Sequence, residues 1–148
     1  NDLGNFGCIA VANALKQNSS IADLNLSENS IQKDGGMAIA DCLKTNSSLN
    51  KLDLSFNHIG HFGCIAIASA LGTNSSLMSL NLRNNFGSNN SGNDVAVKFA
   101  GALAQNETLT ELNLFNNTIR EEGHEALIRV LEKSNSTLTT FNYLHDFP

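Results

Sequence analysis

The chain has very little proline, no tryptophan and no long apolar segment. One proline in 148 residues argues against a proline-rich linker, and the absence of tryptophan argues against an aromatic cage for a ligand. No apolar run approaches the ~20 residues that a helix needs to cross a bilayer, so no membrane partner is expected. The sequence does not open with a basic segment followed by an apolar one, so no signal peptide is visible in it.

Basic residues are also sparse. The net charge is −5, and the nine lysines and arginines are scattered along the chain. Binding to a phosphate backbone needs a concentrated positive surface, so nucleic acid is not an expected partner. With 41% hydrophobic and 16% charged residues, the composition is that of a soluble globular chain.

What the sequence does contain is a repeat. Aligned on their paired leucines, four units and an altered fifth begin at Ile21, Leu49, Leu77, Leu109 and Leu138. The spacings are 28, 28, 32 and 29 residues, and "NDLGNFGCIAVANALKQNSS" at the start matches the second half of a unit. Such periodicity is typical of solenoids, whose units bury their apolar faces only by stacking.

Each unit combines two hydrophobic periods. In one unit, Leu52 and Leu54 alternate with polar residues, which predicts a short strand. Further along that unit, Gly63, Ile67 and Leu71 lie four residues apart, which indicates one face of a helix. We therefore predict an α/β fold with one strand and one helix in each unit.

The pattern LxxLxLxxNxIxxxGxxAxAxxLxxN resembles the ribonuclease-inhibitor class of leucine-rich repeats over essentially the whole chain. This class occurs in ribonuclease inhibitor, Ran GTPase-activating protein and the sensor regions of NOD-like receptors. The resemblance implies a right-handed solenoid shaped as a horseshoe arc, with parallel strands on the concave face and helices on the convex face.

We expect a single leucine-rich-repeat domain over residues 1–148 and interpret it as a fragment, because it begins inside a unit. Its expected parts are a partial repeat (1–20), four repeats (21–48, 49–76, 77–108 and 109–137) and a terminal strand (138–148). An open strand edge at an end of the solenoid could pair with another copy of the chain.

An asparagine follows each predicted strand at one repeat position, and four of these are Asn29, Asn57, Asn85 and Asn117. The chain bends there, and backbone groups would otherwise be buried without partners. An asparagine amide offers both a donor and an acceptor. We predict that these residues form a structural ladder and do not contact a ligand.

Asn-x-Ser/Thr triplets raise the alternative of a glycosylated, secreted chain. Five of them begin at the turn between a helix and the next strand, at Asn18, Asn46, Asn74, Asn106 and Asn135. Asparagine tolerates the left-handed backbone that ends a helix, and serine bonds the amides of a turn. Since only a turn explains why the triplets recur at the repeat period, we favour turns.

The three cysteines point to a reducing compartment. Cys8 and Cys64 hold the same helical position two units apart, beyond the ~7 Å between Cα atoms that a disulfide tolerates. Cys42 lies in the unit between them, six positions later in its repeat. An odd number of buried thiols suits a cytoplasmic protein, as does the resemblance.

No catalytic or metal-binding constellation is evident. His58, His61 and Cys64 are spaced as H-x-x-H-x-x-C, but the repeat places them across a bend and a helix start, and no fourth ligand follows. Glu121 and Glu122 precede a helix, where negative charge complements its dipole. We therefore predict no enzyme activity, no cofactor and no metal.

The strand side chains that face away from the core are the candidate partner contacts. The first row contains Asp23, Lys51, Ser79 and Glu111; the second Asp53, Asn81 and Asn113; the third Ser27, Ser55, Arg83 and Phe115. Arg83 beside Phe115 is the sort of pair that dominates interface energetics.

Two further features leave alternatives open. The third unit has four extra residues, and its polar segment at 83–94 would project over one end of the concave face, either as part of a binding surface or as drift in a tolerant loop. On the outer side of the helices, one apolar position recurs at Ile9, Met37, Ile65 and Val97. We favour packing between neighbouring helices there over an outer docking strip.

The leading hypothesis is a non-catalytic recognition module that binds a protein partner on its concave face. A rigid row of side chains at strand spacing suits recognition and performs no chemistry by itself. The alternatives are a GTPase-activating protein similar to the Ran regulator and an extracellular glycosylated recognition domain. The sequence leaves open the partner, the oligomeric state and whether further repeats flank the chain.

Overall fold

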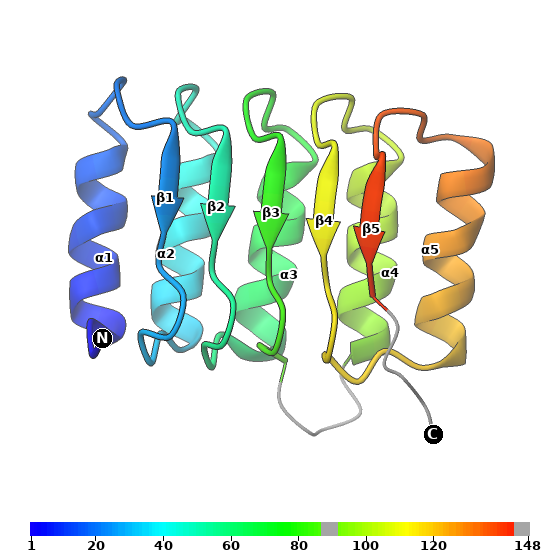
Figure 1. Ribbon diagram of the computed structural model, residues 1–148, viewed down its shortest axis with the longest axis horizontal. Helices are drawn as coiled ribbons and strands as arrows, with labels where there is room; N and C mark the ends of the chain where they lie inside the picture. The colour runs from blue at the N-terminus through cyan, green and yellow to red at the C-terminus, as the bar shows by residue number, and fades with distance from the viewer. Residues whose placement is uncertain (87–91, 144–148) are drawn as a thin grey trace.

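The computed structural model describes residues 1–86 and 92–143, in which helices and strands alternate along a single row (Figure 1). The helices are α1 (Gly4–Leu15), α2 (Lys33–Leu43), α3 (Gly60–Leu71), α4 (Gly92–Leu103) and α5 (Glu121–Lys133). The strands are β1 (Asp23–Asn25), β2 (Lys51–Asp53), β3 (Ser79–Asn81), β4 (Glu111–Asn113) and β5 (Thr140–Asn142).

The strands form one parallel sheet in the order β1-β2-β3-β4-β5. Its register aligns one core residue from every strand, namely Leu24, Leu52, Leu80, Leu112 and Phe141. Each helix returns the chain behind the sheet, so the crossovers are right-handed, as strand twist favours (Figure 1). The predicted α/β solenoid with adjacent parallel strands is confirmed.

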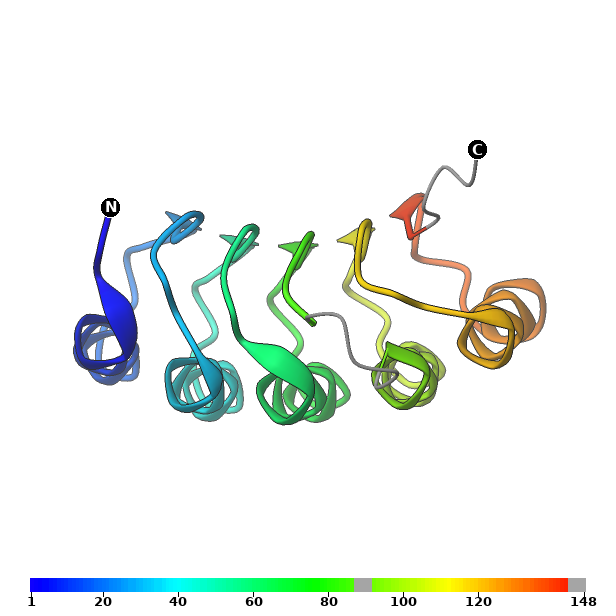
Figure 2. The same ribbon diagram turned by 90° about the horizontal axis from the view of Figure 1, so that it is seen from below.

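The two layers form a shallow arc, with the strands on its inner side and the helices on its outer side (Figure 2). Helices with side chains are ~10 Å wide, whereas hydrogen-bonded strands lie only ~4.8 Å apart. Stacking one strand and one helix per unit therefore curves the row toward the sheet, which makes the strand layer the concave face.

The core lies between the layers, and it consists of the apolar residues at the two predicted hydrophobic periods. Leu52 and Leu80 from the strands, and Ile67 and Leu71 from α3, are almost fully buried. Gly63 makes room for the buried Ile59 side chain at the start of α3, because a Cβ there would lie 2.5 Å from Ile59 Cγ2. Among the described residues, no helix is long and apolar enough to cross a membrane.

Buried asparagines join neighbouring units at the ends of β2, β3 and β4. Asn57 Oδ1 accepts the backbone N–H groups of Asn29 (3.0 Å) and Ile31 (2.9 Å). Its Nδ2 donates to the carbonyls of Leu26 in the preceding unit and Leu54 in its own, both at 2.9 Å. One amide therefore satisfies backbone groups of two units in a bend that excludes water.

The ladder continues across the longer third unit. Asn85 Nδ2 donates to Leu54 O (2.8 Å), and Asn117 Nδ2 donates to Leu82 O (2.8 Å). Asn117 Oδ1 accepts the N–H groups of Asn85 and Phe86. The extra residues of this unit thus leave the contacts between units intact.

A second ladder occupies the opposite ends of the strands, at the Asn-x-Ser/Thr turns. Asn46 Oδ1 accepts the N–H groups of Ser48 and Leu49, and its Nδ2 donates to Leu15 O and Asn18 O in the preceding unit. Nδ2 donates to the preceding unit in the same way at Asn74, Asn106 and Asn135. Since a glycan is attached through Nδ2, a sugar at these buried positions would break the contact between units.

Replacing Asn57 by alanine should destabilise the fold far more than replacing Asn29. Asn57→Ala removes partners from the N–H groups of Asn29 and Ile31 and from Leu26 O, so we expect a loss of ~3–5 kcal/mol in unfolding free energy. The Asn29 side chain makes one hydrogen bond within the described residues, to Ser27 O, so Asn29→Ala should cost only ~1 kcal/mol. Urea unfolding measures both losses, and equal losses would contradict the ladder.

Candidate binding face

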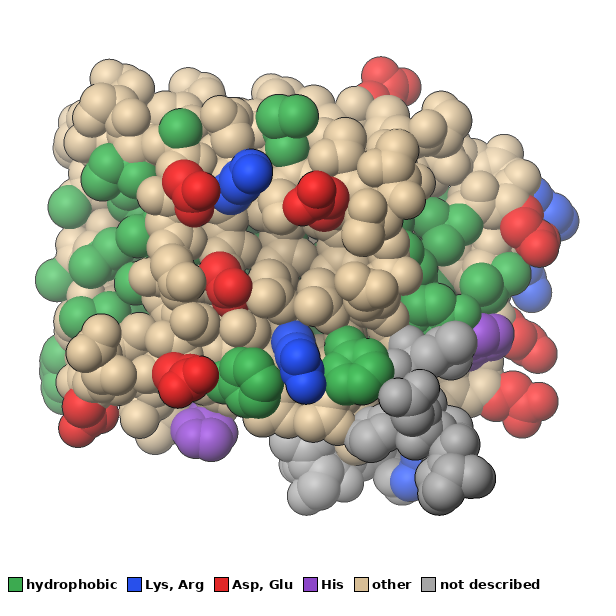
Figure 3. Space-filling view, in the orientation of Figure 1, with side chains coloured by type: hydrophobic (Ala, Val, Ile, Leu, Met, Phe, Trp, Pro, Cys, Tyr) green, Lys and Arg blue, Asp and Glu red, His purple; other side chains and the backbone are tan. Residues whose placement is uncertain are grey.

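The first row of candidate contacts is brought together as expected. The register places Asp23, Lys51, Ser79 and Glu111 side by side across the sheet. The three charged side chains are exposed, and Ser79 is half-buried. Figure 3 shows acidic and basic side chains alternating across one end of this face. The row therefore presents charges of both signs to solvent.

The second row holds the strand ends in place. Asp53, Asn81 and Asn113 each accept, through Oδ1, the backbone N–H of the residue two positions later, at 2.8 to 3.1 Å. This Asx turn stops the strand and starts the bend. Asn81 Nδ2 also donates to Asp53 Oδ2 at 3.0 Å. These half-buried side chains face the concave side, but much of their bonding capacity is used within the fold.

Ser55 does not fit the contact role predicted for it. Its side chain is only 5% exposed, and its hydroxyl donates to Asp53 Oδ1 at 2.6 Å. Ser27 is half-buried and donates similarly to Asn25 Oδ1 at 2.7 Å. A short hydroxyl side chain at this position turns back onto the strand instead of pointing outward.

Arg83, in the third row, is held between two aromatic rings. Its Cζ lies over the Phe115 ring at 4.9 Å from the centroid and over the Phe56 ring at 5.0 Å. Both distances are within the ~6 Å range of cation–π attraction. In Figure 3, a basic side chain lies between two hydrophobic ones on the sheet face, as these contacts require. The predicted Arg83–Phe115 pair is thus part of a three-residue cluster, which we call the Arg83 cluster.

The backbone holds the Arg83 cluster rigidly. Phe56 N donates to Arg83 O at 2.8 Å, and Asn84 N donates to Phe115 O at 3.1 Å. Arg83 N is bound by Asn81 Oδ1. Because these bonds join three adjacent units, the three side chains start from fixed positions before any partner arrives.

Phe56 was missed by comparing only the strand rows, because it lies in the bend that follows β2. It is 41% exposed and has a left-handed backbone with φ 53°. The same bend position is left-handed in the neighbouring units, where it is Glu28, Asn84 or Asn116. A bulky aromatic residue is unusual in this conformation, so a single phenylalanine at a polar repeat position was the available signal.

The outer surface of the helices carries a second apolar region. Met37 and Val97 are 46% and 45% exposed, so the expected packing between helices covers them only in part. A groove of about 410 Å³ separates α3 from α4 and is lined in part by Ile65, Val97 and Gly101. Small residues along these helices leave this space open.

The extra polar segment of the third unit lies partly outside the described residues, since 87–91 are not described. Before this gap, Phe86 is buried and donates its N–H to Asn117 Oδ1 at 3.0 Å. The prediction that the segment projects over the concave face concerns 87–91 and stays a prediction.

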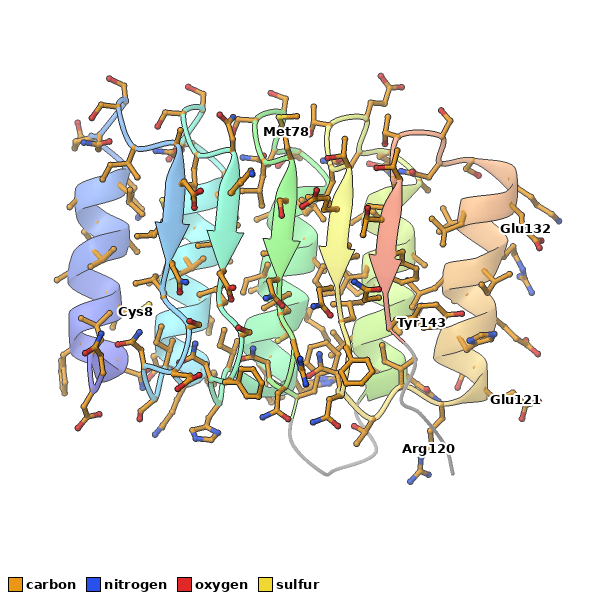
Figure 4. All side chains as sticks on the ribbon, viewed as in Figure 1. Cys8, Met78, Arg120, Glu121, Glu132 and Tyr143 are labelled. Carbon is orange, nitrogen blue, oxygen red and sulfur yellow. The ribbon has the colours of Figure 1, made fainter. Side chains whose placement is uncertain are left out.

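At the last strand, aromatic side chains replace the leucines of the repeat. Phe141 and Tyr143 stack with their ring centroids 4.5 Å apart, and Tyr143 lies 5.2 Å from His124 of α5. Figure 4 labels Tyr143 at the end of β5. Pairing between copies at a free sheet edge stays a prediction.

The cysteines are free and buried. Burial raises the pKa of the Cys8 thiol to about 11, and it also raises the pKa of Cys64. Cys8 lies on α1 (labelled in Figure 4), and its Sγ is 3.6 Å from Gly35 O. The described residues contain no group of three or more His, Cys, Asp or Glu side chains that could hold a metal ion.

Comparison with known proteins agrees with this architecture. A family model described as "Leucine Rich repeat" matches residues 17–40, 45–68 and 105–127, while no curated protein sequence matches the chain significantly. The matched segments are therefore leucine-rich repeats, and the chain as described has the fold of a leucine-rich-repeat solenoid. Its membership of the ribonuclease-inhibitor class stays a prediction.

Two solved structures have a similar fold. One, titled "Leiomodin-1 Actin-Binding Site 2 (ABS2)", is 21% identical with a TM-score of 0.67, over 90% of this chain and 79% of the other. The other is the tropomodulin C-terminal domain from Caenorhabditis elegans, 14% identical with a TM-score of 0.77, over 96% and 83% of the two chains. At such low identities the likeness concerns the fold.

The buried thiols should resist modification in the native protein. Since the thiolate is the reactive form and burial raises the pKa of Cys8 to about 11, little thiolate exists at pH 8. We expect a disulfide-exchange reagent to label the three cysteines rapidly in urea and only slowly in buffer. Rapid labelling of one thiol per native molecule would show that a cysteine is accessible.

Substitutions at Phe56 should separate backbone strain from ring contact. Phe56→Asn relieves a left-handed strain of ~1–2 kcal/mol but loses a cation–π contact of ~0.5–1 kcal/mol, so its unfolding free energy should stay near that of the wild type. Phe56→Ala loses the contact and keeps the strain. Urea unfolding should therefore rank the asparagine variant above the alanine variant, and the reverse order would contradict this account.

Proposed function

We propose that this chain is a non-catalytic recognition module that binds a protein partner on its concave strand face. The observation that carries the proposal is the Arg83 cluster, in which Arg83 lies over the rings of Phe56 and Phe115. Arginine and large aromatic side chains supply most of the energy at protein interfaces, and they do so near the interface centre. Arg83 follows the central strand β3, with the two rings in the units on either side.

The rigidity of the face supports this function. Ordering a loop or a long side chain upon binding reduces affinity, whereas a surface that is already ordered avoids that cost. The two asparagine ladders fix the spacing of the strands, and the rings of the cluster restrain the Arg83 side chain. A partner can therefore bind this face with little ordering of the module.

The charges around the cluster favour selectivity over affinity. Asp23, Lys51 and Glu111 are exposed at the opposite end of the strands from Arg83. Exposed charges at an interface rim mainly steer encounters and reject wrongly charged partners. We infer that this row selects among partners which the cluster anchors.

A cytoplasmic location forms part of the proposal. Cys8, Cys42 and Cys64 are free thiols, which suits a reducing compartment. Four of the Asn-x-Ser/Thr asparagines use their Nδ2 groups to join neighbouring units, so their glycosylation would oppose folding. Both observations favour this location over an extracellular one.

Actin is the first partner to test, because the similar leiomodin fragment is titled as an actin-binding site. Immobilised wild-type chain would be exposed to purified actin and, in parallel, to cytosol, with bound proteins identified by mass spectrometry. A second assay addresses catalysis by adding the chain to purified small GTPases and measuring GTP hydrolysis. Stimulated hydrolysis would contradict a non-catalytic module.

The double variant Arg83→Glu/Phe115→Ala should lose binding to the captured partner. Interface hot spots contribute ~2 kcal/mol or more, so affinity should fall at least ~30-fold. Met37→Ala is the matched control, because Met37 is exposed on the opposite face of the molecule, and it should bind as the wild type does. Unchanged affinity of the double variant for a partner that binds the wild type would refute the concave-face assignment.

A further inference from the structure

We propose that the partner presents the carboxylate of an aspartate or glutamate side chain to the edge of the Arg83 guanidinium, between the two rings. This inference rests on the proposed function above and names the chemical group that the Arg83 cluster binds. It follows from the contacts that the guanidinium makes with the two rings and from the positions of the acidic residues on the strand face.

Two aromatic rings flank the guanidinium, and its N–H donors make no hydrogen bond to the described residues. Phe56 and Phe115 lie 5.0 and 4.9 Å from Arg83 Cζ and come from the bends after β2 and β4, on either side of β3. A cation–π contact with a ring does not use up the N–H donors of a guanidinium, which are directed outward in its plane. A planar, two-oxygen acceptor matches this edge and can bind it through two parallel hydrogen bonds.

The chain itself supplies no acid to Arg83. Among the described residues, ion pairs are formed by Lys16 and Lys44, both with Asp41 on the helix side of the molecule. On the strand face, Asp53 is the acid in the neighbouring row, and its oxygens accept from Ser55 and Asn81. Its negative charge is thus stabilised without Arg83, and Arg83 is an exposed cation with its edge donors unused by the described residues.

The aromatic walls strengthen the pairing. Rings on either side of Arg83 exclude water from an incoming acceptor, and charge attraction grows as water is removed. The rings also restrain the guanidinium, so less side-chain entropy is lost on binding. An exposed arginine without such walls would gain little from an ion pair.

The surrounding charge favours a singly charged acceptor. The strand face carries Asp23, Asp53 and Glu111, whereas Lys51 and Arg83 are its basic residues within the described rows, and the whole chain has a net charge of −5. A dianionic phosphate would experience stronger repulsion from this field than a carboxylate. The chemistry therefore points to an acidic side chain rather than a phosphorylated one.

The test observes the Arg83 Nε–H group by NMR while short blocked peptides are added. The probes are Ac-Leu-Glu-Leu-NH2, its Gln analogue, its phosphoserine analogue, and Ac-Leu-Gln-Leu with a free terminal carboxylate. We expect the Glu peptide to shift the Arg83 signal to saturation and to bind at least ~10-fold more tightly than the Gln peptide. Equal binding of the Glu and Gln peptides would overturn the proposal, as would tighter binding of the phosphoserine or free-carboxylate peptide.

Two exposed basic residues on the same face provide matched variants. Arg83→Gln should abolish binding of the Glu peptide, whereas Lys51→Gln should leave its affinity unchanged. Loss of binding in the Lys51 variant alone would place the carboxylate elsewhere and overturn the assignment to Arg83.

The outcomes separate this inference from the proposed function. If Phe115→Ala loses the captured partner but Arg83→Gln keeps it, the concave face binds protein and the carboxylate assignment is wrong. If neither variant affects partner capture while the Glu peptide still shifts Arg83 Nε–H, the carboxylate site stands and the proposed function fails.

Discussion

The side-chain amide of a buried asparagine, shared between two successive units, is the interaction on which this structure depends. At the ends of β2, β3 and β4, Asn57 and its counterparts donate to the preceding unit and accept N–H groups from it. At the other end, Asn46 and its counterparts donate to the preceding unit through Nδ2 and accept, through Oδ1, N–H groups of their own turn. Without these amides, the bends that they serve would bury backbone N–H and C=O groups that have no partner, at a cost of ~1–3 kcal/mol for each group.

The amide ladders also decide what the molecule can present on its surface. Because they fix each strand against the next, residues from three units reach one small region with their backbones already bound. The Arg83 cluster depends on this arrangement, since Phe56 and Phe115 are 59 residues apart in the sequence but both contact one guanidinium. Local sequence supplies the residue types, and the stacking of units brings them together.

The regular part of the fold was predictable because each unit repeats the same physical solution. The alternation at Leu52 and Leu54 and the four-residue spacing from Gly63 to Leu71 were sufficient to place strand, helix and core. The features that the sequence did not predict are side chains whose orientation is set by the bend after a strand. Ser55 turns onto Asp53, and Phe56 reaches Arg83 from a left-handed bend residue, and neither outcome follows from alternation along a strand.

The four extra residues of the third unit have a consequence for how such a chain can change over evolutionary time. Asn85 and Asn117 are 32 positions apart instead of 28, but they form the same kind of amide bond as the other pairs. An added segment between the bend and the helix therefore leaves the strand register unchanged, and a duplicated unit would find the same acceptors on its neighbour. Duplication of a unit and insertion of a loop segment can thus occur independently of each other in this architecture.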